Sequence, residues 1–488
     1  MTTEPALPQG RTAQDVLAEL RTLRAQDAPT RGGHTFAYVY DAGLDGLDAL
    51  AAAAYTEYAS VNGLDMTVFP SVARLENDLV AAAVALLGAP GAQGTFTSGG
   101  TESILLAVKT ARDHARTVRG VTAPQLVLPS TAHAAFHKAA AYLGLETVVV
   151  PVDAGTFRAD AAAMAAALTE RTVLVVASAP SYAHGVIDPV AEIAAAAASR
   201  GVLCHVDACI GGWFLPYLRR AGREVPAFDL SVPGVTSLSV DLHKYAYADK
   251  GASVVLYRDA GLRRHQYFAH AGWPGYPVVN PTVQGTKPAG LLAQAWAVQQ
   301  RIGEDGYTAL ARSVAEAADR LLAGLSGIDD VRVLGEPRAS LVSFTLLDAD
   351  GAPDLSLLLH LADEMRERGW YLQPQLSFEG LPPNLHLTLT PATHGRVDAL
   401  LADLAAALKA ARALEPVAVD PGLAELAAGL DPDTLGPEEM EAVLAFAGLT
   451  GDGGLPRRTA PVLVLLDALP GRLKERLLTE FVGSVFQV

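Results

Sequence analysis

Short apolar runs alternate with longer segments of helical period between about Leu75 and Tyr257. The short runs are rich in β-branched residues and apolar throughout, which is typical of strands covered on both faces. This pattern predicts strands at 126–128, 147–150, 172–177, 202–206, 237–240 and 253–256. It predicts helices between them at 101–116, 133–143, 161–168 and 189–199. Such alternation predicts an α/β domain with parallel strands and helical crossovers.

The pattern changes after Arg258. From there to Gly290 the chain is rich in aromatic residues and proline, which predicts a long loop, and long ordered loops are usually functional. A long helical pattern and a second α+β region follow, with strands near 331–333, 339–345 and 385–389. We therefore predict an N-terminal segment, a large domain, a smaller C-terminal α+β domain and a helical tail, with bounds 1–60, 61–310, 311–415 and 416–488.

Composition and charge narrow the class of protein. Half of the 488 residues are hydrophobic and 18% are charged, which excludes a disordered chain and a coiled coil. The formal net charge of −16 disfavours nucleic acid as a partner. The apolar runs are shorter than the ~20 residues that cross a bilayer, and residues 1–10 lack the pattern of a signal peptide. Cys204 and Cys209 fit neither a disulfide framework nor zinc spacing. We expect a cytoplasmic protein without a metal site or a membrane span.

The first candidate for chemistry is a glycine turn. An extended run from Thr95 turns through Gly99 and Gly100 into a helix that begins near Thr101. A helix N-terminus presents backbone N–H groups and a favourable dipole to an anion, so this turn could bind a phosphate group. The alternative is an ordinary strand-to-helix turn with Glu102 placed in the first helical turn for stability.

Two further candidates follow predicted strands. Asp207 comes directly after the strand 202–206, at the sheet edge where open α/β sheets bind ligands, although it could also only cap the next turn. Lys244 follows the strand 237–240 and has histidine and tyrosine neighbours. It could be a solvated loop lysine. If these neighbours enclose it, however, its pKa would be lowered, as a Schiff-base lysine requires. An anion site, a carboxylate and an amine together are the set that holds pyridoxal phosphate.

At these motifs the chain resembles a known family. It is similar to the fold type I pyridoxal-phosphate enzymes of the group II decarboxylase branch and, within that branch, to the sphingosine-1-phosphate lyases. The resemblance runs from about residue 50 to residue 389. The matching segments are Thr97-Ser-Gly-Gly-Thr-Glu-Ser-Ile-Leu, Thr131-Ala-His-Ala-Ala-Phe-His-Lys-Ala-Ala, 180–189, His205-Val-Asp-Ala-Cys-Ile-Gly-Gly and Asp241-Leu-His-Lys-Tyr-Ala-Tyr-Ala-Asp-Lys-Gly.

The resemblance implies the fold and the cofactor contacts. The fold would be the transferase-like α/β fold, with a seven-stranded, mainly parallel sheet and a small C-terminal α+β domain. The cofactor would be pyridoxal 5'-phosphate. Lys244 would carry it, Asp207 would keep its ring nitrogen protonated, and His133 would stack on its ring. The remaining implied cofactor contacts are Gly99, Gly100 and Thr101 to the phosphate, with Ser239 and His243 as secondary contacts.

The resemblance also implies a homodimer, because this family builds its active sites from two subunits. Gly285 and Thr286 match a segment that reaches the phosphate of a neighbouring subunit, and Lys250 matches a second lysine near the site. Two positions depart from the family pattern. Asp65 stands where a histidine borders the substrate pocket, and Lys287 replaces an arginine.

We expect a lyase that cleaves a phosphorylated amino alcohol to an aldehyde and phosphoethanolamine. The alternative is an amino-acid decarboxylase that releases carbon dioxide, which a carboxylate at Asp65 could suit. A third hypothesis, a carrier of the cofactor without turnover, is disfavoured because Lys244, Asp207 and His133 are all present. Tyr40, Tyr182 and Tyr245 are candidate bases. The sequence leaves the substrate, the base and the role of the tail open.

Overall fold

The computed structural model describes residues 10–419, 422, 429–436 and 457–486. Its main sheet has seven strands in the order β1-β7-β6-β5-β4-β2-β3. Only β7 runs antiparallel to its neighbours, so the predicted α/β class and mainly parallel sheet are confirmed. The strands are β1 (Gln93–Thr97), β2 (Gln125–Pro129), β3 (Glu146–Val150), β4 (Thr172–Ser178), β5 (Leu203–Asp207), β6 (Ser237–Asp241) and β7 (Ser253–Tyr257).

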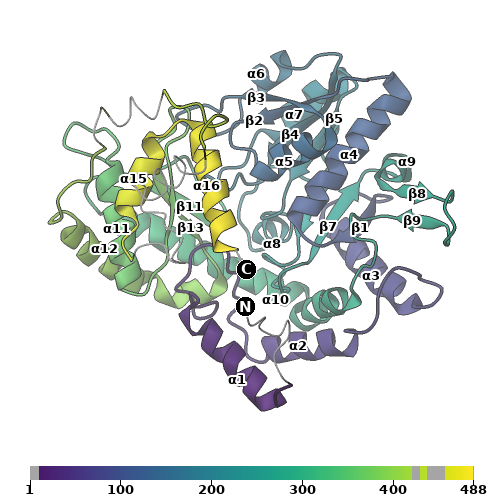
Figure 1. Ribbon diagram of the computed structural model, residues 1–488, viewed down its shortest axis with the longest axis horizontal. Coiled ribbons are helices and arrows are strands. Elements are labelled where there is room, and N and C mark those ends of the chain that lie inside the picture. The colour runs from purple at the N-terminus through teal and green to yellow at the C-terminus, as the bar shows by residue number, and fades with distance from the viewer. Residues whose placement is uncertain (1–9, 420–421, 423–428, 437–456, 487–488) are drawn as a thin grey trace, which may run out of the picture.

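Helices cover this sheet and join its parallel strands (Figure 1). They are α4 (Gly100–Arg119), α5 (Ala134–Leu143), α6 (Ala161–Ala166), α7 (Val190–Ser199) and α8 (Leu215–Arg220). Both α4 and α5 end at a glycine in the left-handed region, Gly120 and Gly144, where a side chain would be strained. Ile104, Val108 and Phe136 of these two helices pack against β2 and β4 in one buried cluster. The helices predicted between the strands are therefore present.

The segment predicted as a loop after Arg258 is partly regular, so that prediction is wrong in part. It contains α9 (Ala260–Arg263) and a hairpin of β8 (Phe268–His270) and β9 (Val278–Asn280). All three residues of β8 are exposed, so the hairpin buries no alternating face that a sequence pattern could reveal.

A four-stranded antiparallel sheet forms the second lobe, in the order β10-β11-β13-β12. Its strands are β10 (Val331–Val333), β11 (Leu341–Leu346), β12 (Gln373–Gln375) and β13 (Asn384–Thr388), and α11 (Leu355–Glu367) and α12 (Val397–Ala411) accompany them. In the tail, α15 (Ala460–Ala468) and α16 (Gly471–Val485) lie on this lobe (Figure 1). The buried carboxylate of Asp363 accepts hydrogen bonds from the backbone N–H groups of Thr459 and Ala460 and so fixes the start of α15.

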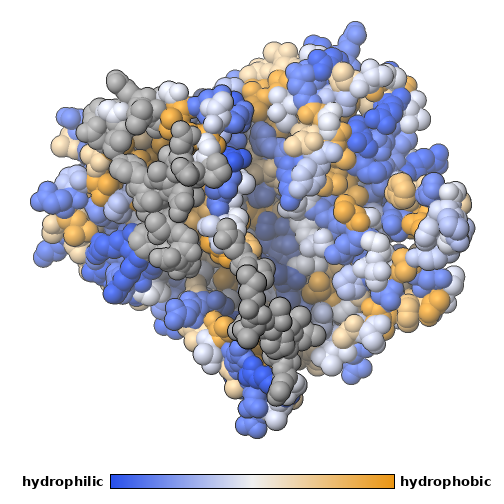
Figure 2. Space-filling view, viewed as in Figure 1, coloured by the Kyte–Doolittle hydropathy of each residue, from blue (hydrophilic) through white to orange (hydrophobic). Residues whose placement is uncertain are grey.

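The N-terminal segment joins the two lobes. It contains α1 (Ala13–Leu23) and α2 (Leu47–Glu57), and α3 (Pro70–Leu86) follows it; the long helix α10 (Ala289–Leu325) contacts α2 and α3. Phe36 donates its backbone N–H to the carbonyl of Tyr371 at 2.9 Å, which ties this segment to the second lobe. Figure 2 shows a hollow between the two lobes. No helix in the described ranges is long and apolar enough to cross a membrane.

Candidate active site

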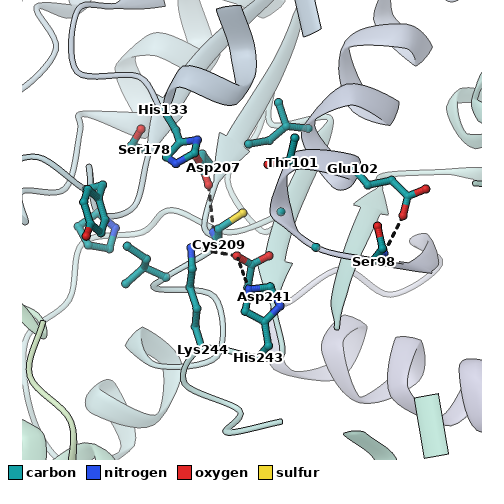
Figure 3. A pocket seen from close by; sticks show the side chains of 16 residues that line it. Ser98, Thr101, Glu102, His133, Ser178, Asp207, Cys209, Asp241, His243 and Lys244 are labelled. Carbon is teal, nitrogen blue, oxygen red and sulfur yellow. Dashed lines mark hydrogen bonds and ion pairs between the residues drawn. The ribbon is translucent and has the colours of Figure 1, made fainter. Parts of the chain in front are cut away.

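A cavity of about 330 Å³ lies where the carboxyl ends of β4, β5 and β6 meet the N-terminus of α4 (Figure 3). This is the edge at which open α/β sheets bind ligands. The cavity brings together most of the predicted cofactor residues from five separate segments. Its lining residues are Ser98, Gly99, Gly100, Thr101, Glu102, Ile104, His133, Ser178, Pro180, Tyr182, Asp207, Cys209, Ile210, Asp241, His243 and Lys244.

The glycine turn is tightly packed from behind. A Cβ on Gly100 would lie 2.8 Å from the sulfur of Cys209 and 2.9 Å from both carboxylate oxygens of Asp241, so only glycine fits. The helix α4 begins here, and its first N–H groups have no partners within the helix. Glu102 braces the turn, because its carboxylate accepts hydrogen bonds from the backbone N–H groups of Ser98 at 2.6 Å and Val283 at 2.7 Å.

Asp207 and His133 both reach the cavity. Asp207 ends β5, and its Oδ1 accepts a hydrogen bond from the backbone N–H of Cys209 at 3.1 Å, which fixes the carboxylate at the strand end. His133 is the N-cap of α5, and its Nδ1 accepts from the N–H of Ala135 at 3.2 Å. His133 therefore caps a helix as well as lining the cavity.

Lys244 forms an ion pair that the sequence analysis did not include. Its Nζ lies 2.9 Å from Oδ2 of Asp241, a carboxylate that ends β6 and is 2% exposed. Burial alone would lower the pKa of Lys244, but the carboxylate of Asp241 more than reverses this and raises the pKa above its ordinary value. Burial opposes ionisation of Asp241 too, yet the charges of Lys244 and His243 hold its pKa below the usual range. The expected lowering of the Lys244 pKa is therefore wrong for this arrangement.

The two secondary cofactor candidates lie at different depths. Ser239 is fully buried and bonds His205, at 3.2 Å from Oγ to Nε2, and accepts from the thiol of Cys209 at 3.3 Å. It supports the cavity wall from behind. His243 lines the cavity, its Nε2 lies 3.6 Å from Oδ2 of Asp241, and burial lowers its pKa despite that carboxylate.

The candidate tyrosines have distinct surroundings. Tyr182 lines the cavity and donates its hydroxyl to Oε1 of Gln373 on β12 at 2.5 Å. Tyr245 is buried and donates to the carbonyl of Leu389 at 2.7 Å, which is a structural contact between the lobes. Tyr40 packs edge-on against Tyr245 with ring centroids 5.1 Å apart, and burial raises the pKa of Tyr40 to about 12.

Lys250 lies close to this cluster without lining the cavity. Its ammonium lies 4.7 Å from the centre of the Tyr40 ring. Although much of the side chain is exposed, enclosure of the ammonium and the charge of Lys244 lower the pKa of Lys250 to about 8. Lys250 can therefore change its charge near neutral pH.

Four other residues singled out in the sequence do not line the cavity of their own chain. Asp65 is exposed, and its carboxylate accepts from the N–H of Thr67 at 2.8 Å. Gly285 and Thr286 are exposed as well. Lys287 is buried, and its Nζ forms an ion pair with Oε2 of Glu76 at 2.8 Å. This contact indicates a structural role for Lys287.

Sequence reasoning missed Asp241, the brace at Glu102 and the partner of Tyr182 at Gln373. Asp241 could have been found, since it precedes Lys244 by three residues at a strand end. Gln373 lies 191 residues from Tyr182 and belongs to the other lobe. No local pattern marks such a contact.

Comparison with known proteins identifies the family. The model of the pyridoxal-dependent decarboxylase conserved domain matches residues 2–347. The chain belongs to the pyridoxal-dependent decarboxylase family. It is therefore a pyridoxal-phosphate enzyme, as the glycine turn, Asp207 and Lys244 predicted. A second model, described as the C-terminal putative HTH domain of pyridoxal-dependent enzymes, matches residues 421–484.

Relatives within the family include several sphingosine-1-phosphate lyases. The lyase of Arabidopsis thaliana is 38% identical over 436 residues, covering 88% of this chain and 78% of the relative. The structure of a sphingosine-1-phosphate lyase from Burkholderia pseudomallei is 36% identical, with a TM-score of 0.78 over 84% of this chain and 94% of that one. The glutamate decarboxylase of Lactobacillus brevis, at 18% identity and a TM-score of 0.74, shares the fold.

The residues of the cavity fit pyridoxal phosphate. A buried amine, a glycine turn at the start of a 20-residue helix and a carboxylate at a strand end face one space. In addition, Oδ1 of Asp241 is a buried acceptor without a hydrogen-bond partner in the described part of the chain. A buried polar atom without a partner indicates a missing ligand or solvent contact.

Replacing Gly100 by alanine tests whether the glycine turn binds the cofactor. The added methyl group would displace Cys209 or Asp241, so Gly100→Ala should weaken pyridoxal phosphate binding about tenfold or more, as overpacking costs roughly 1–3 kcal/mol. The affinity is measured by titrating cofactor-free protein and following the visible absorbance. Gly395→Ala is the control, since its Cβ would meet nothing within 4 Å. Equal affinity of the two variants would contradict the assignment.

Proposed function

We propose that this enzyme cleaves the Cα–Cβ bond of a phosphorylated amino alcohol, such as a long-chain base phosphate, and releases an aldehyde and phosphoethanolamine. The observation that carries the proposal is the 36% identity to a solved sphingosine-1-phosphate lyase along 84% of this chain. Pyridoxal phosphate, when bound, supplies an electron sink for the bond that breaks. The chain's own residues have to bind it, orient the substrate and move protons.

The cofactor-binding roles follow from where the side chains lie. Lys244 supplies the amine that holds the cofactor, and the N–H groups at Gly99–Thr101 bind its phosphate. Asp207 faces the cavity from the end of β5, where a carboxylate would pair with a protonated ring nitrogen. His133 also lines the cavity and lies beside Asp207 (Figure 3), so it supplies a flat ring for stacking.

Tyr182 and Lys250 are the proposed substrate residues. Because the Tyr182 hydroxyl gives its proton to Gln373, its lone pairs remain free to accept a hydrogen bond from a substrate hydroxyl or ammonium. Lys250 carries a positive charge below a pH of about 8 and so can attract a substrate phosphate. Tyr40 holds the Lys250 ammonium through its ring. Asp65 is exposed and does not line the cavity of its own chain, so we propose that it borders the substrate of a neighbouring subunit.

An amino-acid decarboxylase is the second candidate. A probable L-tyrosine/L-aspartate decarboxylase of Methanothermobacter thermautotrophicus is 32% identical over 360 residues, which is 93% of that protein. The two reactions need the same cofactor contacts and differ in which bond of the substrate stands perpendicular to the cofactor ring. The choice between them therefore depends on the substrate contacts.

A product assay distinguishes the two functions. The holoenzyme is given a long-chain base phosphate, the same base without phosphate, and free tyrosine and aspartate, and aldehyde and carbon dioxide are measured. We expect aldehyde from the phosphorylated base alone. Lys250→Ala should raise KM for that base about tenfold or more, because a hydrogen bond between charged groups contributes roughly 1.5–3 kcal/mol.

Lys138→Ala is the matched control, since Lys138 also lies over a tyrosine ring, that of Tyr142, whereas Lys250 lies over Tyr40 and close enough to Lys244 for the two charges to interact. Carbon dioxide from a free amino acid, with no aldehyde from the phosphorylated base, would replace the lyase by the decarboxylase.

We further propose a cytoplasmic homodimer whose subunits share active sites. Glu102 accepts from the N–H of Val283, which anchors the segment carrying Gly285 and Thr286 to the phosphate-binding turn. Gly285 and Thr286 are nevertheless exposed on the chain itself, as residues that serve a neighbouring site would be.

Complementation between two inactive chains tests the shared site. Lys244→Ala removes the amine, and Thr286→Asp places a carboxylate against the neighbour's phosphate. In a mixed dimer one site carries both changes and the other carries neither, so random mixing should restore about a quarter of the activity. No recovery, or full activity of a monomer at all concentrations, would contradict shared sites.

A further inference from the structure

A second cavity, of about 320 Å³, is lined by residues of both lobes and shares no lining residue with the active-site cavity. Arg158 and Ile187 belong to the lobe of the main sheet, where they precede α6 and α7. Glu336 and Arg338 belong to the loop between β10 and β11 of the second lobe. The cofactor contacts and the proposed substrate contacts include none of these residues, so the cavity can hold a ligand of its own.

The charge of this cavity is positive. Its charged lining residues are two arginines, Arg158 and Arg338, and one carboxylate, Glu336. The chain as a whole carries a formal net charge of −16, so most of its surface repels anions. A positive cavity in such a chain concentrates anions at one place.

Arg158 is held in place and has donors to spare. Its Nε donates a hydrogen bond to the carbonyl of Ile187 at 2.7 Å, which fixes the guanidinium group at the cavity wall. Within the described residues this group makes no other hydrogen bond and no ion pair. A guanidinium group has five N–H donors, and its planar arrangement matches a phosphate or a carboxylate.

Arg338 can also turn to a ligand. It pairs with Glu336 at 3.2 Å, and the two side chains are 53% and 84% exposed. An ion pair that is this exposed contributes little to stability, so an anion can compete for the donors of Arg338. Val186 and Ile187 line the same cavity and offer an apolar wall to the carbon atoms of an organic anion.

A compact turn, residues 181–187, joins this cavity to the active site. Tyr182 lines the active-site cavity, whereas Val186 and Ile187 line the second cavity. Ser181 donates its backbone N–H to the carbonyl of Val186 at 2.9 Å, and Gly185 donates to the carbonyl of Ser181 at 3.0 Å. These two hydrogen bonds make the turn one unit, so an event at Ile187 acts on Tyr182.

The position of Tyr182 depends on how the two lobes pack. Its hydroxyl donates to Gln373, and its ring stacks on that of His386 with centroids 4.3 Å apart. Gln373 and His386 are direct partners in the pairing of β12 with β13, so one place on the second lobe holds Tyr182. Any ligand that joins the lobes stabilises this contact.

We propose that the second cavity binds a small anion with a phosphate or carboxylate group, which joins Arg158 to Arg338 across the two lobes and thereby stabilises the contact of Tyr182 with Gln373 and His386. A ligand that binds only the packed arrangement of the lobes shifts the population toward it. The site is independent of the reaction, because it involves neither the cofactor nor the substrate.

Calorimetric titration of the holoenzyme, without substrate and at low ionic strength, tests the site. Inorganic phosphate and succinate are the two probes, and they show whether a phosphate or a carboxylate is preferred. We expect wild-type protein to bind at least one of them. Arg158→Gln and Arg338→Gln should each weaken this binding about tenfold or more, because each removes hydrogen bonds between charged groups.

Two control variants should bind the probe as wild type does. Arg200→Gln removes an exposed arginine that forms no ion pair in the described ranges and lines neither cavity. Lys250→Ala removes the cation proposed to attract the substrate phosphate. Arg338→Gln leaves the hydrogen bond of Arg158 to Ile187 in place, so it decides alone if Arg158→Gln fails to fold.

Hydrogen exchange measured by mass spectrometry tests the link to Tyr182. The peptides that contain residues 181–187 and 373–386 should exchange more slowly when the probe is bound. At a probe concentration ten times its Kd, openings that release the ligand should slow about tenfold in wild-type protein. Arg338→Gln should show no slowing at that concentration.

Three results would overturn the proposal. One is that wild-type protein binds neither probe. Another is that the probe binds Arg338→Gln as tightly as Arg200→Gln. If binding is instead lost in Lys250→Ala and kept in Arg338→Gln, the anion occupies the substrate site, which leaves the proposed function intact. Binding with unchanged exchange at residues 181–187 would contradict the link to Tyr182.

Discussion

The ion pair between Lys244 and Asp241 is the interaction around which this active site is arranged. Taking two charges out of water is costly, and their attraction offsets this only where geometry and further contacts are good. Here Asp241 is fixed at the end of β6, and the turn that follows brings Nζ of Lys244 to 2.9 Å from Oδ2 of Asp241. The N-terminus of α4 faces the same carboxylate at Gly100. The sheet order places β5 beside β6, which brings Asp207 to the same cavity.

Much of the fold could be predicted because its main sheet is buried on both faces. The strands β4 and β5 are almost wholly buried, so their apolar runs are evident in the sequence. The hairpin β8–β9 and the three-residue strand β12 could not be predicted, because their residues are exposed or half-buried and contain no alternating pattern. The predicted domain bounds remain predictions.

The sequence predicted the site residues that lie next to strand ends. It did not predict contacts between segments that are far apart in the sequence. Gly100 follows a predicted extended run, Asp207 directly follows a predicted strand, and Lys244 follows another by four residues; the cavity brings the three together. Gln373 reaches Tyr182 only because the lobes pack against each other. The pKa of Lys244 was misjudged because burial was considered without the carboxylate three residues earlier. The type of residue and its enclosure indicate that Lys244 lies in a site. The charge of Lys244, in contrast, depends on the neighbouring carboxylate of Asp241.

We propose that pyridoxal phosphate is bound to Lys244. The most direct measurement is borohydride reduction of the purified holoenzyme, followed by proteolysis and mass spectrometry of the modified peptide. We expect one modified lysine, Lys244, and loss of the modification in Lys244→Ala. Modification of Lys250, which lies over Tyr40, or of Lys287, which pairs with Glu76, would contradict the account.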